Sequence, residues 1–186
     1  LFMAISYKFR FMLLSIIPHQ PRKINPSKQK AGDKVSYIPF TDEQKIALDF
    51  ISFLKDNHLV FYKDNCNCWK DKIYYWVKFD NKCVCFISIK DPDEKDNHWT
   101  IWSDNMDSKW LENYPVDKEI RETAWKYIDH CGSCGSCGGG RHKVIFGKEF
   151  DDICGCTFRI DNPKSDDLRF LKIMVEIRIK EIQNKS

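Results

Sequence analysis

The sequence predicts an α+β domain with a mostly antiparallel sheet, helices packed on one side of the sheet and a cysteine-rich loop. Three observations favour this class. Segments rich in β-branched and aromatic residues follow one another across short polar turns, and three other segments carry apolar residues at helical spacing. The chain shows no strand–helix–strand alternation and no internal repeat. At 186 residues, it fits a disordered or basic N-terminal segment, residues 1–40, and a single domain, residues 41–186.

The first predicted helix runs from about Thr41 to Asn57. Thr41 and Gln44 form a capping box, in which each side chain accepts a hydrogen bond from the backbone of the other residue. The apolar positions that follow lie on one helical face: Ile46, Leu48, Phe50, Ile51 and Leu54.

A β-hairpin is predicted next. Residues 73–79 and 83–89 are rich in β-branched and aromatic residues, and Asp80-Asn81 supplies a tight turn between them. Residues 98–102 predict a third strand.

The C-terminal half begins with a predicted helix over residues 115–129, which leads directly into the cysteine loop. Residues 144–146 and 153–160 predict two strands. Ser165 is the expected cap of a last helix that ends near Ile182. Its core-facing stripe comprises Leu168, Leu171, Met174, Val175 and Ile179.

The charge is unevenly distributed along the chain. Residues 1–40 carry seven Lys/Arg and one Asp, whereas residues 41–186 carry 23 Lys/Arg and 26 Asp/Glu. The predicted domain is therefore mildly acidic, which argues against nucleic acid as its main partner.

The apolar run 11–17 follows two basic residues, as in a signal peptide, but no cleavage site follows. It is too short to span a bilayer, so either an untidy N-terminus or a targeting segment fits it.

Five of the nine cysteines lie close together, in two overlapping Cys-x-x-Cys steps and a Cys-x-Cys that follows after sixteen intervening residues. This spacing can bring four thiolates around one metal ion, and a structural zinc site is the preferred interpretation. An iron–sulfur cluster is the alternative cofactor, and a metal-free loop rich in thiols stays open. The candidate ligands exceed the four needed by one: Cys131, Cys134, Cys137, Cys154 and Cys156, with His130 as a weaker substitute.

The remaining cysteines have simpler interpretations. Cys83 and Cys85 alternate with other residues of a predicted strand and are expected to be small core residues. Cys66 and Cys68 lie in a polar segment that could contribute to a second metal site. An odd number of cysteines, several of them two residues apart, fits a reducing cytoplasm better than a disulfide framework.

Residues 145–154, Ile-Phe-Gly-Lys-Glu-Phe-Asp-Asp-Ile-Cys, are followed by Asn162-Pro163 and a closing helix. This arrangement resembles a family of small bacterial cysteine-cluster proteins whose function is unassigned. The resemblance covers about residues 40–182. It implies the limits of the domain and the pairing of Cys154 with the upstream cysteine loop, and it implies no activity.

The predicted hairpin also suggests a ligand-binding surface. Tyr74 and Trp76 point away from the strand positions expected to face the helices, so with Trp102 they line the other sheet face. Exposed aromatic side chains of this kind bind a small flat ligand or a protein partner. The alternative is that a helix or loop covers them.

The sequence therefore predicts a zinc-stabilised domain that binds a small ligand or a protein. The runner-up is a thiol-redox or metal-dependent enzyme or sensor. No set of side chains has the order or spacing of a known catalytic site, so an enzyme is not favoured. The Cys-x-x-Cys steps follow the predicted C-terminus of a helix, where the helix dipole disfavours a thiolate.

Overall fold

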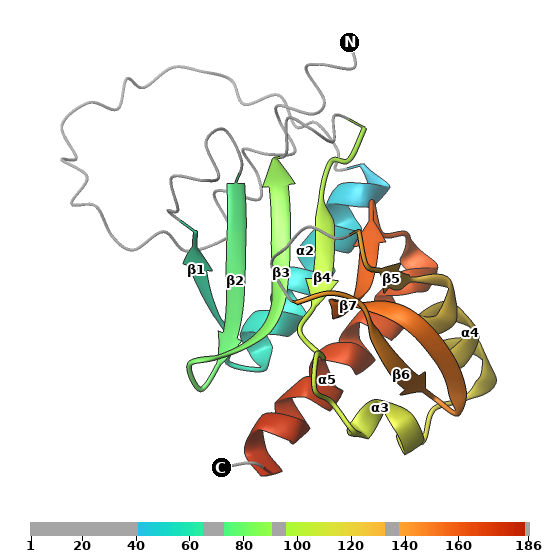
Figure 1. The fold of residues 1–186 in the computed structure, drawn as a ribbon. Coiled ribbons are helices and arrows are strands. Elements are labelled where there is room, and N and C mark those ends of the chain that lie inside the picture. The colour runs from blue at the N-terminus through green and yellow to red at the C-terminus, as the bar shows by residue number, and fades with distance from the viewer. Residues whose placement is uncertain (1–40, 65–72, 91–95, 133–137, 185–186) are drawn as a thin grey trace, which may run out of the picture.

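The computed structural model describes residues 41–64, 73–90, 96–132 and 138–184 (Figure 1). Over these ranges the chain has the predicted α+β fold, an antiparallel sheet with helices packed against it. Residues 1–40 lie outside the described ranges, so the division into a tail and a domain remains a prediction. In the described part of the chain, no helix combines the length and the hydropathy needed to cross a membrane.

The sheet has seven strands, and every pair is antiparallel. Six strands lie in the order β1-β2-β3-β4-β7-β5, and β6 also pairs with β7. The bounds are β1 Val60–Lys63, β2 Ile73–Phe79, β3 Lys82–Lys90, β4 Thr100–Ser103, β5 Ile128–His130, β6 Arg141–Ile145 and β7 Lys148–Asp161.

Two features that were predicted from neighbouring residues, the capping box of the first helix and the hairpin turn, are confirmed. Helix α2 (Asp42–Asp56) begins after Thr41, whose hydroxyl accepts from the Gln44 backbone N–H at 3.3 Å. The Gln44 side chain accepts from the Thr41 N–H at 2.9 Å in return, which completes the capping box. The β2–β3 hairpin turns at Asp80 and Asn81, which both have positive φ, as the tightest hairpin turns require.

The predicted helix 115–129 is wrong at its C-terminal end. Helix α4 (Lys118–Lys126) begins after Asp117, whose carboxylate accepts from the Ile120 N–H at 3.0 Å. Residues 128–130 form strand β5 instead of a last helical turn, because they pair with β7. This pairing joins residues 23 and 30 positions apart, so a local helical pattern did not reveal it.

The other differences from the prediction involve fewer residues. Strand β1 and the single-turn helix α3 (Trp110–Asn113) were not predicted, and β4 begins two residues later than expected. The predicted strands at 144–146 and 153–160 are β6 and the much longer β7. A 3-10 turn, Ser165–Asp167, precedes the last helix, and its Asp167 carboxylate accepts from the Lys164 N–H at 2.9 Å, so Ser165 is not the cap.

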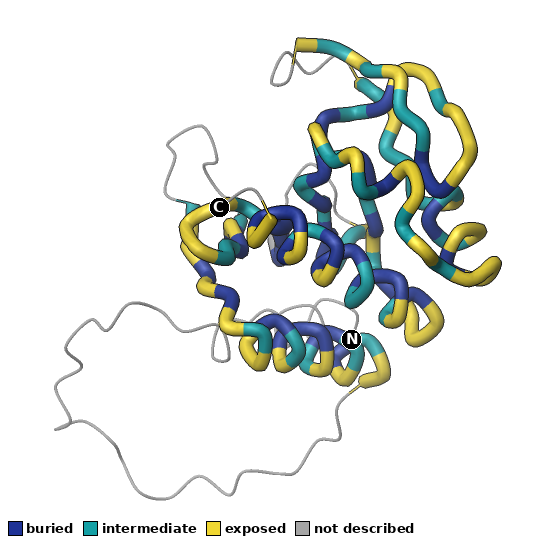
Figure 2. Tube along the Cα trace, turned by 90° about the horizontal axis from the view of Figure 1, so that it is seen from below, coloured by how far each residue is buried: buried dark blue, intermediate teal, exposed yellow. Residues whose placement is uncertain are grey.

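Helices α2 and α5 (Leu168–Asn184) run side by side on one face of the sheet (Figures 1 and 2). In Figure 2, buried residues follow one side of α2 and exposed residues the other. The predicted stripe of α5 is buried at Leu171, Met174, Val175 and Ile179. The core therefore lies between this helix layer and one face of the sheet.

Candidate functional site

One face of the sheet carries a continuous row of large side chains. Tyr62 lies opposite Trp76, Trp76 opposite Phe86, Phe86 opposite Trp102, and Trp102 opposite Arg159. The row crosses β1, β2, β3, β4 and β7, one residue from each strand. Because directly opposed side chains lie on the same face of a sheet, we call these five residues the aromatic row.

The rings of this face contact one another across the strands. Trp76 and Phe86 meet edge to face, with 4.5 Å between ring centroids. Tyr74, which lies two residues before Trp76 on the same face, stacks on Trp102 at 5.7 Å. The Trp76 indole N–H donates to the Asp64 carboxylate at 3.1 Å. These contacts hold the rings in defined orientations, which lowers the entropy lost when a ligand binds.

The β1–β2 end of this face carries the described apolar side chains that are most open to solvent. Three large hydrophobic residues are exposed in the described part of the chain: Val60 at 51%, Tyr62 at 40% and Trp76 at 37%. All three belong to β1 and β2. The predicted orientation of Tyr74, Trp76 and Trp102 is confirmed, because the strand pairings and the ring contacts place them on one face. Helices α2 and α5 lie behind the sheet in Figure 1, and no described helix covers this face.

Two cations lie over the rings. The Arg159 guanidinium is 5.3 Å from the Trp102 ring centroid and 3.1 Å from the Asp161 carboxylate. The Lys78 ammonium lies 5.1 Å from the Tyr62 centroid and 5.7 Å from the Trp76 centroid. Contacts of this length are cation–π interactions.

The predicted cysteine ligands lead to a second region, an irregularity in β7. Strand β5 pairs Ile128 with Phe158 but His130 with Ile153, so three residues of β5 lie opposite six of β7. The extra residues form a bulge, Cys154 to Thr157, which we call the cysteine bulge. Thr157 has φ +73°, a strained value for a β-branched residue.

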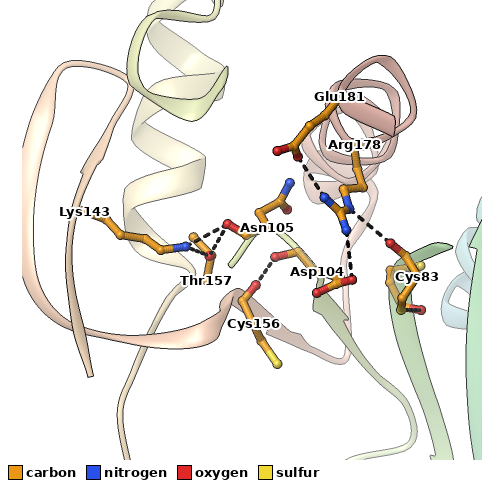
Figure 3. Close-up of polar contacts among 10 residues, drawn as sticks. Cys83, Asp104, Asn105, Lys143, Cys156, Thr157, Arg178 and Glu181 are labelled. Atoms are coloured by element: carbon orange, nitrogen blue, oxygen red, sulfur yellow. Dashed lines mark hydrogen bonds and ion pairs between the residues drawn. The ribbon is translucent and has the colours of Figure 1, made fainter. Parts of the chain in front are cut away.

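Buried polar groups hold the cysteine bulge (Figure 3). The Ser103 hydroxyl donates to the Cys156 carbonyl and accepts from the Phe158 N–H at 3.2 Å. The Lys143 ammonium donates to the Thr157 hydroxyl at 2.5 Å and to the Asn105 carbonyl at 2.7 Å. Burial lowers the pKa of Lys143 to about 8. These contacts compensate part of the backbone strain at Thr157.

The thiols of Cys154 and Cys156 lie close together on the bulge. Burial, followed by the neighbouring Cys154, raises the pKa of Cys156 to about 12. Burial also raises the pKa of Asp129 in β5, and a hydrogen bond with Cys154 opposes that rise. The Cys131 N–H donates to the Asp152 carbonyl at 2.8 Å, so the start of the cysteine loop lies beside the bulge.

The structure thus brings the backbone of Cys131 next to the strand that carries Cys154 and Cys156. Cys134 and Cys137 lie outside the described residues. In the ranges that the structure describes, no three His, Cys, Asp or Glu side chains are arranged to hold a metal ion. Cys85 is buried as predicted, whereas Cys83 is half-buried. Cys66 and Cys68 also fall outside the described residues.

Sequence reasoning missed a third feature, a partly buried ion-pair network around Arg178 of α5. Arg178 donates to the Asp104 carboxylate at 3.2 Å, to the Glu181 carboxylate at 3.0 Å and to the Cys83 carbonyl at 3.1 Å (Figure 3). Burial raises the pKa of Asp104, and Arg178 opposes the rise. A signal did exist, since Arg178 and Glu181 interrupt the apolar pattern of the last helix.

The surface beside this network is hollowed. A cleft of about 250 Å³ is lined by Lys82, Asp104, Met106, Asp107, Arg178 and Ile182. Its lining has two basic and two acidic side chains, so the cleft offers no formal excess of either charge. It shares no residue with the aromatic row.

The chain matches no protein-family model, no curated protein and no solved structure. The resemblance to bacterial cysteine-cluster proteins therefore remains a prediction.

Proposed function

We propose that this protein is a ligand-binding module whose binding surface is the aromatic row. One observation carries the proposal: four aromatic side chains on four adjacent strands are paired in register on a sheet face that no described helix covers. Exposed apolar surface of this kind costs free energy in water and marks an interaction site.

The chemistry of the row favours a flat ligand. Tyr62 and Trp76 are the most exposed rings, and they are held by neighbouring residues rather than by the ligand. A planar group stacked on such a ring gains about 1–3 kcal/mol. A small molecule is preferred over a protein, because the exposed part of the row spans only β1 and β2 and a stable protein interface needs roughly 800 Å² from each partner.

A neutral planar probe, naphthalene-2-carboxamide, tests this function. Trp76→Ala should weaken its binding by tenfold or more, as expected for the loss of about 1.4 kcal/mol of stacking. Tyr114→Ala is the matched control, since Tyr114 also lies under a lysine, at 5.2 Å from Lys180, but away from the sheet face. Equal binding by the wild type and Trp76→Ala would place the ligand elsewhere.

The module also holds a structural zinc ion bound by four of Cys131, Cys134, Cys137, Cys154 and Cys156. The position of Cys131 beside the cysteine bulge supports this part of the proposal. Zinc–thiolate coordination contributes roughly 10 kcal/mol or more in small peptides, enough to stabilise a strained bulge. Reduced thiols of this kind fit a cytoplasmic location.

Elemental analysis of protein purified under reducing conditions should find close to one zinc per chain. Cys154→Ser should lower the zinc content and the stability, whereas the control Cys83→Ser should leave the zinc content unchanged. Brown protein with visible absorption would indicate an iron–sulfur cluster instead. Fully folded protein without metal would contradict the zinc site and favour the thiol-redox alternative.

A further inference from the structure

Lys78 differs from the other charged residues beside the aromatic row. Its ammonium lies over two exposed rings, those of Tyr62 and Trp76. Among the described residues, no carboxylate pairs with it. A cation on an apolar surface without a carboxylate partner is open to an anion supplied from outside the protein.

The two carboxylates that flank the row have other partners. Asp64 accepts from the Trp76 indole at 3.1 Å. Asp161 accepts from the Thr100 hydroxyl at 2.7 Å and from Arg159 at 3.1 Å. Arg159 is therefore neutralised by Asp161, and of these two described cations Lys78 is the one that an incoming anion meets.

We propose that the aromatic row binds a flat aromatic ring that carries an anionic group, with the ring stacked at Trp76 and the anion held by Lys78. This inference rests on the proposed function, because it names the ligand class for the same surface. The anion is a carboxylate or a phosphate attached close to the ring, since Lys78 and the Trp76 ring are adjacent.

The charge of the surface limits the number of anionic groups that the ligand carries. A polyanion such as an oligonucleotide gains affinity from several cations that release counterions. Among the side chains that the structure describes, this face offers one such cation, and residues 41–186 carry 23 Lys/Arg against 26 Asp/Glu. The ligand is accordingly a small molecule with one flat ring system and one anionic group.

A pair of isosteric probes isolates the contribution of the anion. Naphthalene-2-carboxylate and naphthalene-2-carboxamide share ring, size and shape and differ in charge. We expect the full-length protein to bind the carboxylate about fivefold more tightly than the amide, the ratio that corresponds to an exposed ion pair of about 1 kcal/mol. This preference should shrink as salt is added, whereas the affinity for the amide should change little.

Lys78→Met should remove the preference and leave the affinity for the amide within about twofold of the wild type. The matched control is Lys172→Met, because Lys172 also lies over a ring, 5.5 Å from the Phe53 centroid, but is paired with Asp49 at 2.8 Å on the helix side of the molecule. The control variant should keep the preference intact.

The outcomes separate this inference from the proposed function. Equal affinity for both probes, or a preference that survives Lys78→Met, would overturn the anion site while leaving the aromatic row as a binding surface. Failure of both probes to bind would overturn the binding surface and the anion site with it.

Discussion

Tyr75 and Trp76 are neighbours in β2 that point to opposite faces of the sheet. Tyr75 is 1% exposed on the face that α2 and α5 cover, and Trp76 is 37% exposed on the face that carries the aromatic row. Both faces are rich in large apolar side chains, yet the helices that the structure describes cover only one of them. The core face therefore contributes to stability, and the outer face is the one for which we propose contact with a ligand.

The largest expected effect comes from mutating these two neighbours in turn. Tyr75→Ala should lower the free energy of unfolding by about 3 kcal/mol or more, because it leaves a cavity in the core. Trp76→Ala should lower it by only about 1 kcal/mol, the value of its edge contact with Phe86. Urea unfolding measures both values, and similar losses would mean that the outer face is also part of the core.

Two arginines allow the core face and the outer face to be compared for charged groups. Arg178 of α5 reaches the sheet at the Cys83 carbonyl and pairs with Glu181, whose side chain is 1% exposed. Arg178→Met should lower the free energy of unfolding by about 3 kcal/mol, because it removes the guanidinium that pairs with the Glu181 and Asp104 carboxylates. Arg159→Met, on the outer face, should lower the free energy of unfolding by less than about 1 kcal/mol. Thermal unfolding distinguishes the two, and an equal loss would argue against the difference between the faces.

Alkaline pH should lower the stability of the fold through a thiol on the core face. Burial raises the pKa of the Cys85 thiol well above its ordinary value of 9.0. The folded state then holds this proton more tightly than the unfolded state, so its contribution to stability is present below pH 9.0 and lost as the pH rises above it. One such group changes the free energy of unfolding by at most about 1.4 kcal/mol per pH unit.

Cys85→Ala should therefore make the decline in stability between about pH 9 and 10 shallower. Tyr62→Phe on the outer face is the control, and its slope of stability against pH is compared with that of Cys85→Ala. Unfolding curves recorded across this range measure the slope, and an unchanged slope in Cys85→Ala would show that this thiol does not govern it.

Features that depend on adjacent residues could be predicted from the sequence. The capping box at Thr41 and the turn at Asp80-Asn81 are examples, because the residues that form each one lie within four positions. Strand β5 could not be predicted, since its three residues become a strand only through β7. The alternation in β2 predicted that Tyr74 and Trp76 share a face, which holds in the structure.

The candidate sites were predictable to different degrees. The aromatic row needed the pairing of five strands before its continuity became visible, although Tyr74, Trp76 and Trp102 were predicted from strand periodicity alone. The cysteine spacing pointed to β7 but gave no sign of the bulge, which depends on Ser103 and Lys143 from distant segments. Tertiary contacts of this kind leave no local pattern in a sequence.

The most direct test of the central claim, that the aromatic row binds the ligand, is fluorine NMR of protein labelled with 5-fluorotryptophan. Trp→Phe variants, made one at a time, assign the signals. On titration with naphthalene-2-carboxylate, we predict that the Trp76 and Trp102 signals shift together. The Trp99 signal, from a core side chain that is 1% exposed, should stay in place. Shifts at Trp99 without shifts at Trp76, or no shift at any tryptophan, would contradict the claim.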